Sequence, residues 1–130
     1  GRIFAVGGGD PGVFSTSPSE KAESYDPYKD RWKELDDVPN PRLDAAFAEL
    51  DDLLYLVGGD TGDGPTGLTE VYVPGGGWMY GAPLGVPRSS LGMAGLAGRL
   101  VAVGGTGANS VLPTVEECRF FTDLYGYRKE

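Results

Sequence analysis

Three segments of the chain repeat the same features in the same order, and this repetition constrains the fold more than any other property. A short apolar run ends in a glycine pair at Gly7-Gly8, at Gly58-Gly59 and at Gly104-Gly105, with spacings of 51 and 46 residues. In the second and third copies an arginine, Arg42 or Arg88, precedes the first glycine by sixteen residues. Periods of this length indicate a repeat architecture, in which each copy is one structural unit.

The same order continues after each glycine pair. A glutamate follows the pair by eleven residues in the second and third copies, and by a longer interval in the first. Two residues later comes a tyrosine or cysteine, and a tryptophan or tyrosine follows after six or seven more. These positions are Glu23, Tyr25 and Trp32; Glu70, Tyr72 and Trp78; and Glu116, Cys118 and Tyr125.

Each copy is predicted to form four short strands. The chain contains 22 Gly and 10 Pro, and its hydrophobic fraction of 40% argues against disorder. The glycines and prolines are therefore interpreted as turn residues between short strands. Small residues in the first strand suit a crowded centre, and the apolar second strand indicates burial on both faces. The expected strands are 43–50 and 91–96 (inner); 3–6, 54–57 and 100–103 (second); 20–25, 67–73 and 113–120 (third); and 31–35, 78–82 and 124–128 (outer).

This ordered set of features resembles the Kelch repeat, which forms one four-stranded blade of a β-propeller. The resemblance implies an all-β fold: a partial Kelch-type propeller with four-stranded antiparallel blades, in an open arc of about eleven strands. The expected blades are 1–37, 42–83 and 88–130. The third copy departs from the family pattern, with Cys118 in place of tyrosine and Tyr125 in place of tryptophan.

The first blade is expected to lack its inner strand, because alignment of the copies places Gly1 on Asp52 and Gly98 in the turn after that strand. The inner edge of the strand that starts at Arg2 should therefore be unpaired, or paired by a strand from outside residues 1–130. Three interpretations remain open. The chain is part of a longer propeller, it pairs with a second copy into a six-bladed ring, or it stands alone in a capped form.

Charge and composition exclude several functions. The net charge is −8 and no cluster of Lys and Arg is present, which argues against nucleic acid as a partner. The longest apolar run, Leu53 to Val57, is too short to cross a bilayer. The chain has no His, so we expect no Ser–His catalysis, no copper or other metal site and no cofactor. The single cysteine, Cys118, excludes an intrachain disulfide and fits an intracellular protein.

Antiparallel strand order predicts that Arg42 and Arg88 share one end of the arc with the loops 9–19, 60–66 and 106–112. The resemblance to Kelch-family substrate adaptors implies that arginines at this position bind acidic peptides. In the alternative, each arginine pairs with a carboxylate or carbonyl group of the next blade. Partner contacts are expected from these loops because they are rich in small polar residues. The binding residues predicted in total are Arg42, Arg88, Asp60, Thr61, Thr106 and Asn109.

Other conspicuous residues are interpreted as structural. One glutamate per blade indicates a framework role, and the tyrosines and tryptophans are expected to pack within blades. The segment 60–64 has only a faint likeness to a calcium-binding loop, because the spaced oxygen ligands and the final glutamate are absent, so a turn is favoured. Cys118 is expected to be a buried strand residue.

The predicted function is a protein–protein interaction or scaffold module that binds a protein or peptide partner through the loop face. The alternative is part of a Kelch-propeller enzyme that acts on sugars, of the epimerase or mutarotase kind. The sequence that flanks this segment would discriminate between the two functions. A preceding BTB-like helical domain favours an adaptor, whereas a secretion signal with a standalone propeller favours the enzyme. We expect binding rather than catalysis.

Overall fold

The computed structural model describes residues 1–12 and 16–118, and all regular structure in them is β. The expectation of an all-β chain is therefore confirmed for these residues, none of which lies in a helix that could span a membrane. The expected outer strand at 124–128 lies outside the described residues. The strands are β1 (Ile3–Val6), β2 (Gly9–Pro11), β3 (Thr16–Pro18), β4 (Ala22–Asp26), β5 (Arg31–Glu34), β6 (Ala46–Leu50), β7 (Leu53–Val57), β8 (Thr69–Val73), β9 (Gly77–Tyr80), β10 (Gly92–Leu96), β11 (Arg99–Val103) and β12 (Val115–Cys118).

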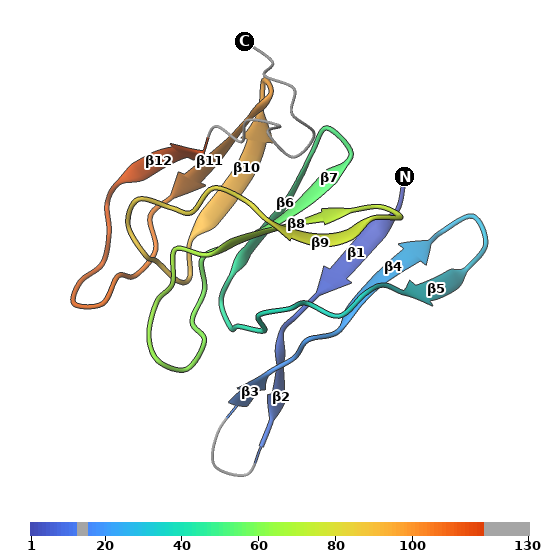
Figure 1. Ribbon diagram of the computed structural model, residues 1–130, viewed down its shortest axis with the longest axis horizontal. Coiled ribbons are helices and arrows are strands. Elements are labelled where there is room, and N and C mark those ends of the chain that lie inside the picture. The colour runs from blue at the N-terminus through green and yellow to red at the C-terminus, as the bar shows by residue number, and fades with distance from the viewer. Residues whose placement is uncertain (13–15, 119–130) are drawn as a thin grey trace.

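Three antiparallel sheets stand side by side in chain order (Figure 1). The second sheet contains all four expected strands as a meander, in the order β6-β7-β8-β9. The first sheet has the order β1-β4-β5, and the described part of the third has the order β10-β11-β12. Each sheet therefore follows the strand order of a propeller blade from its inner to its outer edge.

The first sheet has an open inner edge. Strand β1 pairs with β4 in the register Ile3↔Tyr25 to Val6↔Ala22. No strand from residues 1–12 or 16–118 lies on the other side of β1, where β6 lies beside β7 in the second sheet. This agrees with the expectation that the inner edge is not paired from within the described chain.

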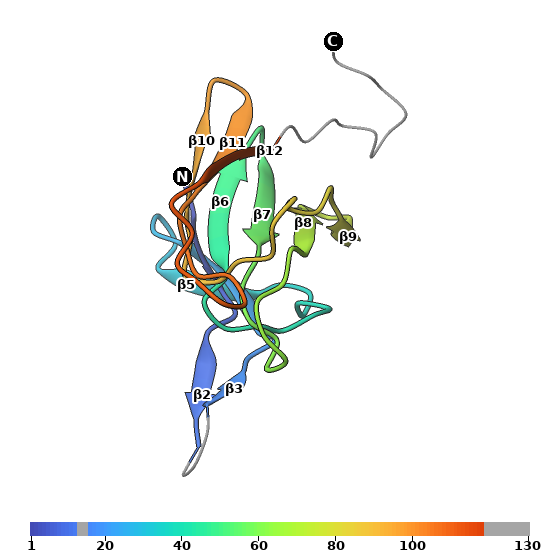
Figure 2. The same ribbon diagram turned by 90° about the vertical axis from the view of Figure 1, so that its left-hand side faces the viewer.

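A two-stranded hairpin was not foreseen by the sequence analysis. Residues 9–19 were expected to be an irregular loop, but β2 and β3 pair antiparallel, with Asp10 opposite Ser17. The hairpin projects beyond the ends of the three sheets (Figures 1 and 2). Extended backbone on both arms of a long loop can satisfy its own hydrogen bonds in this way without a hydrophobic face.

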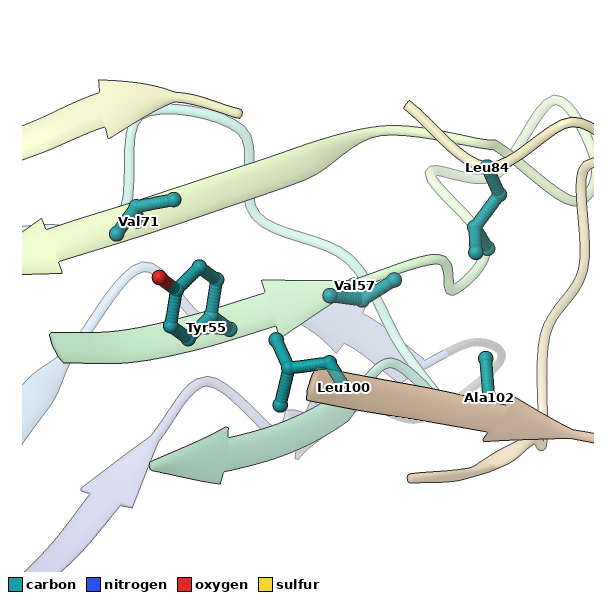
Figure 3. Close-up of a cluster of buried hydrophobic side chains, with 6 residues drawn as sticks. All are labelled: Tyr55, Val57, Val71, Leu84, Leu100 and Ala102. Atoms are coloured by element: carbon teal, nitrogen blue, oxygen red, sulfur yellow. The ribbon is translucent and has the colours of Figure 1, made fainter. Parts of the chain in front are cut away.

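The main core lies between the second and third sheets. Tyr55 and Val57 of β7 face Leu100 and Ala102 of β11, and Leu84 closes the cluster from the segment between the sheets (Figure 3). Leu56, which lies between Tyr55 and Val57 in β7, points to the opposite face of the second sheet, where it packs with Ala22 and Val38 against the first sheet. Strand β7 is thus apolar throughout because neighbouring sheets cover both of its faces.

The small residues of the inner strands permit close approach between sheets. Strand β10 packs beside β6, and a Cβ atom added to Gly95 would lie 2.9 Å from the carbonyl oxygen of Glu49. The glycine pair has a similar explanation. Gly58 has φ +66°, and a Cβ atom there would lie 2.5 Å from the carbonyl oxygen of Arg88 in the next repeat. Only glycine allows both this backbone conformation and this contact.

Candidate binding face

The loop face is the end of the arc that carries the hairpin 9–18 and the loops 60–66 and 106–112 (Figure 1). Two of these loops are tied to the segments that precede the inner strands. Leu43 and Asp60 exchange backbone hydrogen bonds of 2.9 and 2.8 Å, and Ser89 and Thr106 exchange bonds of 3.0 and 2.8 Å. The loops therefore start from fixed positions on the sheets, which is the usual arrangement of binding loops on a rigid scaffold.

Arg42 lies beneath the loop face, inside the second sheet, with only 3% of its surface exposed. Its guanidinium donates to Glu70 Oε2 at 2.5 Å and to the carbonyl oxygens of Gly58 and Leu56 at 2.5 and 2.9 Å. A further bond of 2.8 Å reaches the carbonyl oxygen of Asn40. The planar fork of an arginine can satisfy several acceptors at once, so the buried charge is both paired and fully hydrogen-bonded.

Arg88 repeats this arrangement in the third sheet and is fully buried. It donates to the carbonyl oxygens of Gly104 and Thr114, both at 3.0 Å, and to that of Val86 at 3.3 Å. Its Nη2 lies 3.1 Å from Glu116 Oε2, an ion pair whose atoms are not aligned for a hydrogen bond. The interval of sixteen residues in both copies thus reflects one repeated contact between an arginine and the first glycine of the pair.

The burial of both arginines argues against direct contact with a partner. Of the two interpretations left open by the sequence, pairing with a carboxylate is the one that the geometry supports. One detail of that interpretation is wrong, because Glu70 and Glu116 belong to the same sheet as their arginines and not to the next one. The framework role expected for these glutamates is confirmed.

Asp60 shapes the loop that it begins. Its Oδ1 accepts hydrogen bonds from the backbone N–H groups of Gly62 and Gly64, at 2.8 and 3.2 Å. An aspartate that binds the backbone two residues ahead forms an Asx turn. The turn interpretation of this segment is therefore confirmed.

The remaining predicted binding residues lie on the surface of the loop face. Thr61 is exposed in the loop that follows β7, while Thr106 and Asn109 are exposed in the loop that follows β11. The structure thus separates the six predicted residues into three groups. Arg42 and Arg88 support the face from inside, Asp60 orders a loop, and the three others are open to solvent.

The aromatic residues pack within sheets, as predicted. The rings of Tyr25 and Trp32 are 5.0 Å apart between centroids, and those of Tyr72 and Trp78 are 5.2 Å apart. Trp78 also joins two sheets, because its indole N–H donates to the carbonyl oxygen of Asp36 at 2.8 Å. Cys118 lies in β12, as expected, and its side chain is outside the described part.

Two residues that support the face were missed by the sequence analysis. Val38 and Leu84 are buried between sheets, and their backbone N–H groups donate to carbonyl groups just before β4 and β8, at 2.7 and 2.8 Å. Each lies four residues before a buried arginine. An apolar residue at the same distance before Arg42 and Arg88 was a signal that could have identified both.

Antiparallel four-stranded meanders that stack face to face around small inner strands are the blades of a β-propeller. The chain is an arc of such blades, with its longest loops gathered at one end.

Comparison with known proteins agrees with this class. Residues 1–39 match the family model of the Kelch motif. Human Kelch-like protein 13 is 35% identical over 107 residues, which cover 75% of this chain and 16% of that protein. Human Kelch repeat and BTB domain-containing protein 13 is 36% identical over 102 residues, covering 76% of this chain and 21% of that protein. Kelch-like ECH-associated protein 1A of Danio rerio is 34% identical over 113 residues, covering 83% and 18%. The chain belongs to the Kelch-repeat family, and it spans about a fifth of the length of these relatives.

Proposed function

We propose that the chain is part of a protein-binding scaffold that contacts a protein or peptide partner through the loop face. The observation that carries this proposal is the combination of exposed polar loops with a rigid base. Thr61, Thr106 and Asn109 are open to solvent, whereas the segments from which their loops start are held by paired backbone bonds. A rigid base lowers the entropy lost when loops bind a partner.

The relatives support a protein partner. One of them, from Danio rerio, carries the description ECH-associated in its name. A scaffold role is assigned to this chain as part of the proposal. An intracellular location, expected from the single cysteine, belongs to the proposal as well. No observation in residues 1–12 and 16–118 favours the sugar-acting enzyme over binding.

The expected preference for acidic partners depended on free arginines. Because Arg42 and Arg88 are neutralised by Glu70 and Glu116 inside the sheets, they do not supply open positive charge to the loop face. In this proposal their task is to hold the starts of the loops in place. Recognition then rests on hydroxyl and amide groups, which select partners by hydrogen-bond geometry more than by charge.

Site-specific photo-cross-linking tests this proposal. A photoreactive residue at Thr61, Thr106 or Asn109 should form covalent adducts with a partner protein in cells that express the complete protein. Matched positions at the opposite end of the arc are Asp51 and Ala97, which lie in the tight turns between inner and second strands. These two positions should give no adduct with the same partner.

The pattern of adducts decides the result. Adducts that come from Asp51 and Ala97, but not from the three loop positions, would show that a partner uses the opposite face, and the proposed binding face would be wrong. The adducts are compared at equal expression and equal melting temperature, so that a change of folding does not imitate a change of binding.

A further inference from the structure

Strand β9, at the outer edge of the second sheet, has one free side (Figure 2). It pairs with β8 in the register Val73↔Gly77 to Glu70↔Tyr80, and no strand in the described ranges 1–12 and 16–118 pairs with its other side. The chain continues from β9 into the third sheet, so this edge lies in the middle of the sequence and on the outside of the arc.

The register decides which backbone groups of β9 are available at this edge. The N–H of Gly81 donates to the carbonyl oxygen of Thr69 at 2.9 Å, so these two residues form a hydrogen-bonded pair. Such pairs alternate along an antiparallel ladder, and the residues between them direct their N–H and C=O groups away from the partner strand. In β9 the residues between are Trp78 and Tyr80, whose backbone groups therefore point to the free side.

The side chains of β9 do not protect this edge by charge. Strand β5 has the same outer place in the first sheet, and three of its four residues are charged. Alignment of the two tryptophans matches Lys33 to Met79 and Glu34 to Tyr80. Charged side chains on an outer strand discourage pairing with a further strand. In contrast, the whole segment 71–87 contains no charged residue.

Large side chains are exposed on both faces of β9. Tyr80 is 65% exposed on the same face as Trp78, and Met79 is 37% exposed on the opposite face. The side-chain amide of Asn40 donates to the Tyr80 hydroxyl at 3.1 Å and thus helps to fix the ring. Tyrosine and methionine are both enriched at protein interfaces. A strand added to β9 would cover one of these side chains on each face of the sheet.

The charge of the second sheet and its loops favours a basic partner. The segment 43–87 contains no Lys and no Arg. Apart from the buried Glu70, none of its acidic residues forms an ion pair in the described part of the chain. These residues are Asp44, Glu49, Asp51, Asp52, Asp60 and Asp63. A cationic segment that approaches this blade is therefore attracted by its field.

One further carboxylate lies at the start of β9. The carbonyl oxygen of Asp36 accepts the indole N–H of Trp78, and a Cβ atom added to Gly77 would lie 3.4 Å from Asp36 Oδ2. Asp36 is exposed and forms no ion pair with any residue that the structure describes. It is thus placed to bind a cation beside the free edge.

We propose that the free edge of β9 is a docking site for a basic, extended segment of a partner protein, which adds a strand to the second sheet. Its backbone pairs with Trp78 and Tyr80. Its cationic side chains lie near Asp36 and over the ring of Tyr80, while apolar side chains on the opposite face pack against Met79. A second copy of this chain is the less suitable occupant, because its net charge of −8 repels the same surface.

A seven-residue peptide of alternating lysine and valine, capped at both ends, is the probe for the complete protein. Fluorescence anisotropy should show binding, and a peptide with glutamate in place of lysine should bind at least about tenfold more weakly. Two further peptides carry N-methyl groups on all lysines or on all valines. At least one of them should lose about tenfold in affinity, because the N–H groups that face β9 are removed. Unchanged affinity of both would overturn the proposal.

Variants of the protein locate the site. Met79→Lys gives β9 the residue that β5 has at the matching position, and it should weaken the lysine peptide about tenfold by repulsion. Asp36→Asn should weaken it about threefold. Glu49→Gln makes the same change of charge on β6 and is the control, which should leave the affinity as it is. All three side chains are exposed, so equal melting temperatures are expected.

Three results would show that the proposal is wrong. The first is equal affinity of the lysine peptide for the unaltered protein and for Met79→Lys. The second is an equal loss from Asp36→Asn and Glu49→Gln, since binding would then follow overall charge. The third is self-association of the complete protein in light scattering that Met79→Lys abolishes, because the occupant is then a second copy. None of these measurements involves the loop face, so they do not depend on the proposed function.

Discussion

Replacement of Arg42 by alanine should destabilise the protein strongly, because it leaves the carboxylate of Glu70 buried without its partner. Glu70 is 1% exposed and has two side-chain donors in this structure, Arg42 and Asn40. Removal of one member of a buried ion pair costs about 3–5 kcal/mol in free energy of unfolding. Since small domains are stable by only about 5–15 kcal/mol, the change should be visible as a large shift in any unfolding curve.

The assay is urea denaturation followed by the fluorescence of Trp32 and Trp78, which lie in different sheets. A matched control is Arg99→Ala, because Arg99 also forms an ion pair, with Glu117 at 2.9 Å, but the two side chains are 55% and 36% exposed. An exposed pair of this kind contributes about 0–1 kcal/mol. The difference between the two variants thus reports burial and not the presence of an ion pair.

A double variant, Arg42→Met with Glu70→Leu, separates the lost attraction from the orphaned charge. It should be more stable than Arg42→Ala alone by about 1 kcal/mol or more, since no buried charge remains unpaired. The reasoning would be refuted if Arg42→Ala were no more destabilising than Arg99→Ala. A loss of partner affinity with unchanged stability would instead return Arg42 to the role of a direct contact.

Three further predictions concern backbone and titration. Gly58→Ala should lower the free energy of unfolding by about 2 kcal/mol more than Gly104→Ala does. The two glycines have nearly the same φ, +66° and +65°, but only Gly58 lies against the carbonyl oxygen of Arg88. Equal melting temperatures of the two variants would contradict this. Ala97→Asn should stabilise the protein by about 1 kcal/mol in thermal unfolding, since Ala97 has φ +50° in the turn before β11 and asparagine tolerates that conformation. Burial, with a smaller effect of nearby negative charge, raises the pKa of Tyr55, so the unfolded chain ionises first and stability should fall as pH rises above about 10. Tyr55→Phe should make that fall less steep, and an unchanged slope would show that other tyrosines cause it.

Much of the architecture could be predicted from spacing alone. The glycine pairs, the arginines sixteen residues before them and the aromatic pairs all occupy equivalent positions in their sheets, because each has a steric or electrostatic reason that repeats with the blade. The second strand could be recognised as buried on both faces because its apolar run has no alternation. These features are local, and the repeat displays them more than once.

The environment of the arginines could not be predicted with the same certainty. An arginine at the start of a strand is suited to binding a partner and to holding a framework, and only its distance from Glu70 separates the two roles. The hairpin of β2 and β3 was missed for a different reason. Its sequence has no apolar alternation, and the corresponding loops 60–66 and 106–112 are shorter, so nothing in the repeat indicated that its two arms pair as strands.

Because each buried ion pair is closed within one sheet, the arrangement has a consequence for how such a chain can grow. A gene segment that begins just before the arginine and ends after the outer strand encodes a unit whose buried charges balance internally. Tandem duplication or loss of that unit leaves every arginine with its own glutamate. A gene segment with its boundary between Arg42 and Glu70 would instead encode only one member of the pair, and that residue would be a buried, uncompensated charge. The segments 35–41 and 81–87 are therefore the places where recombination leaves the blades intact.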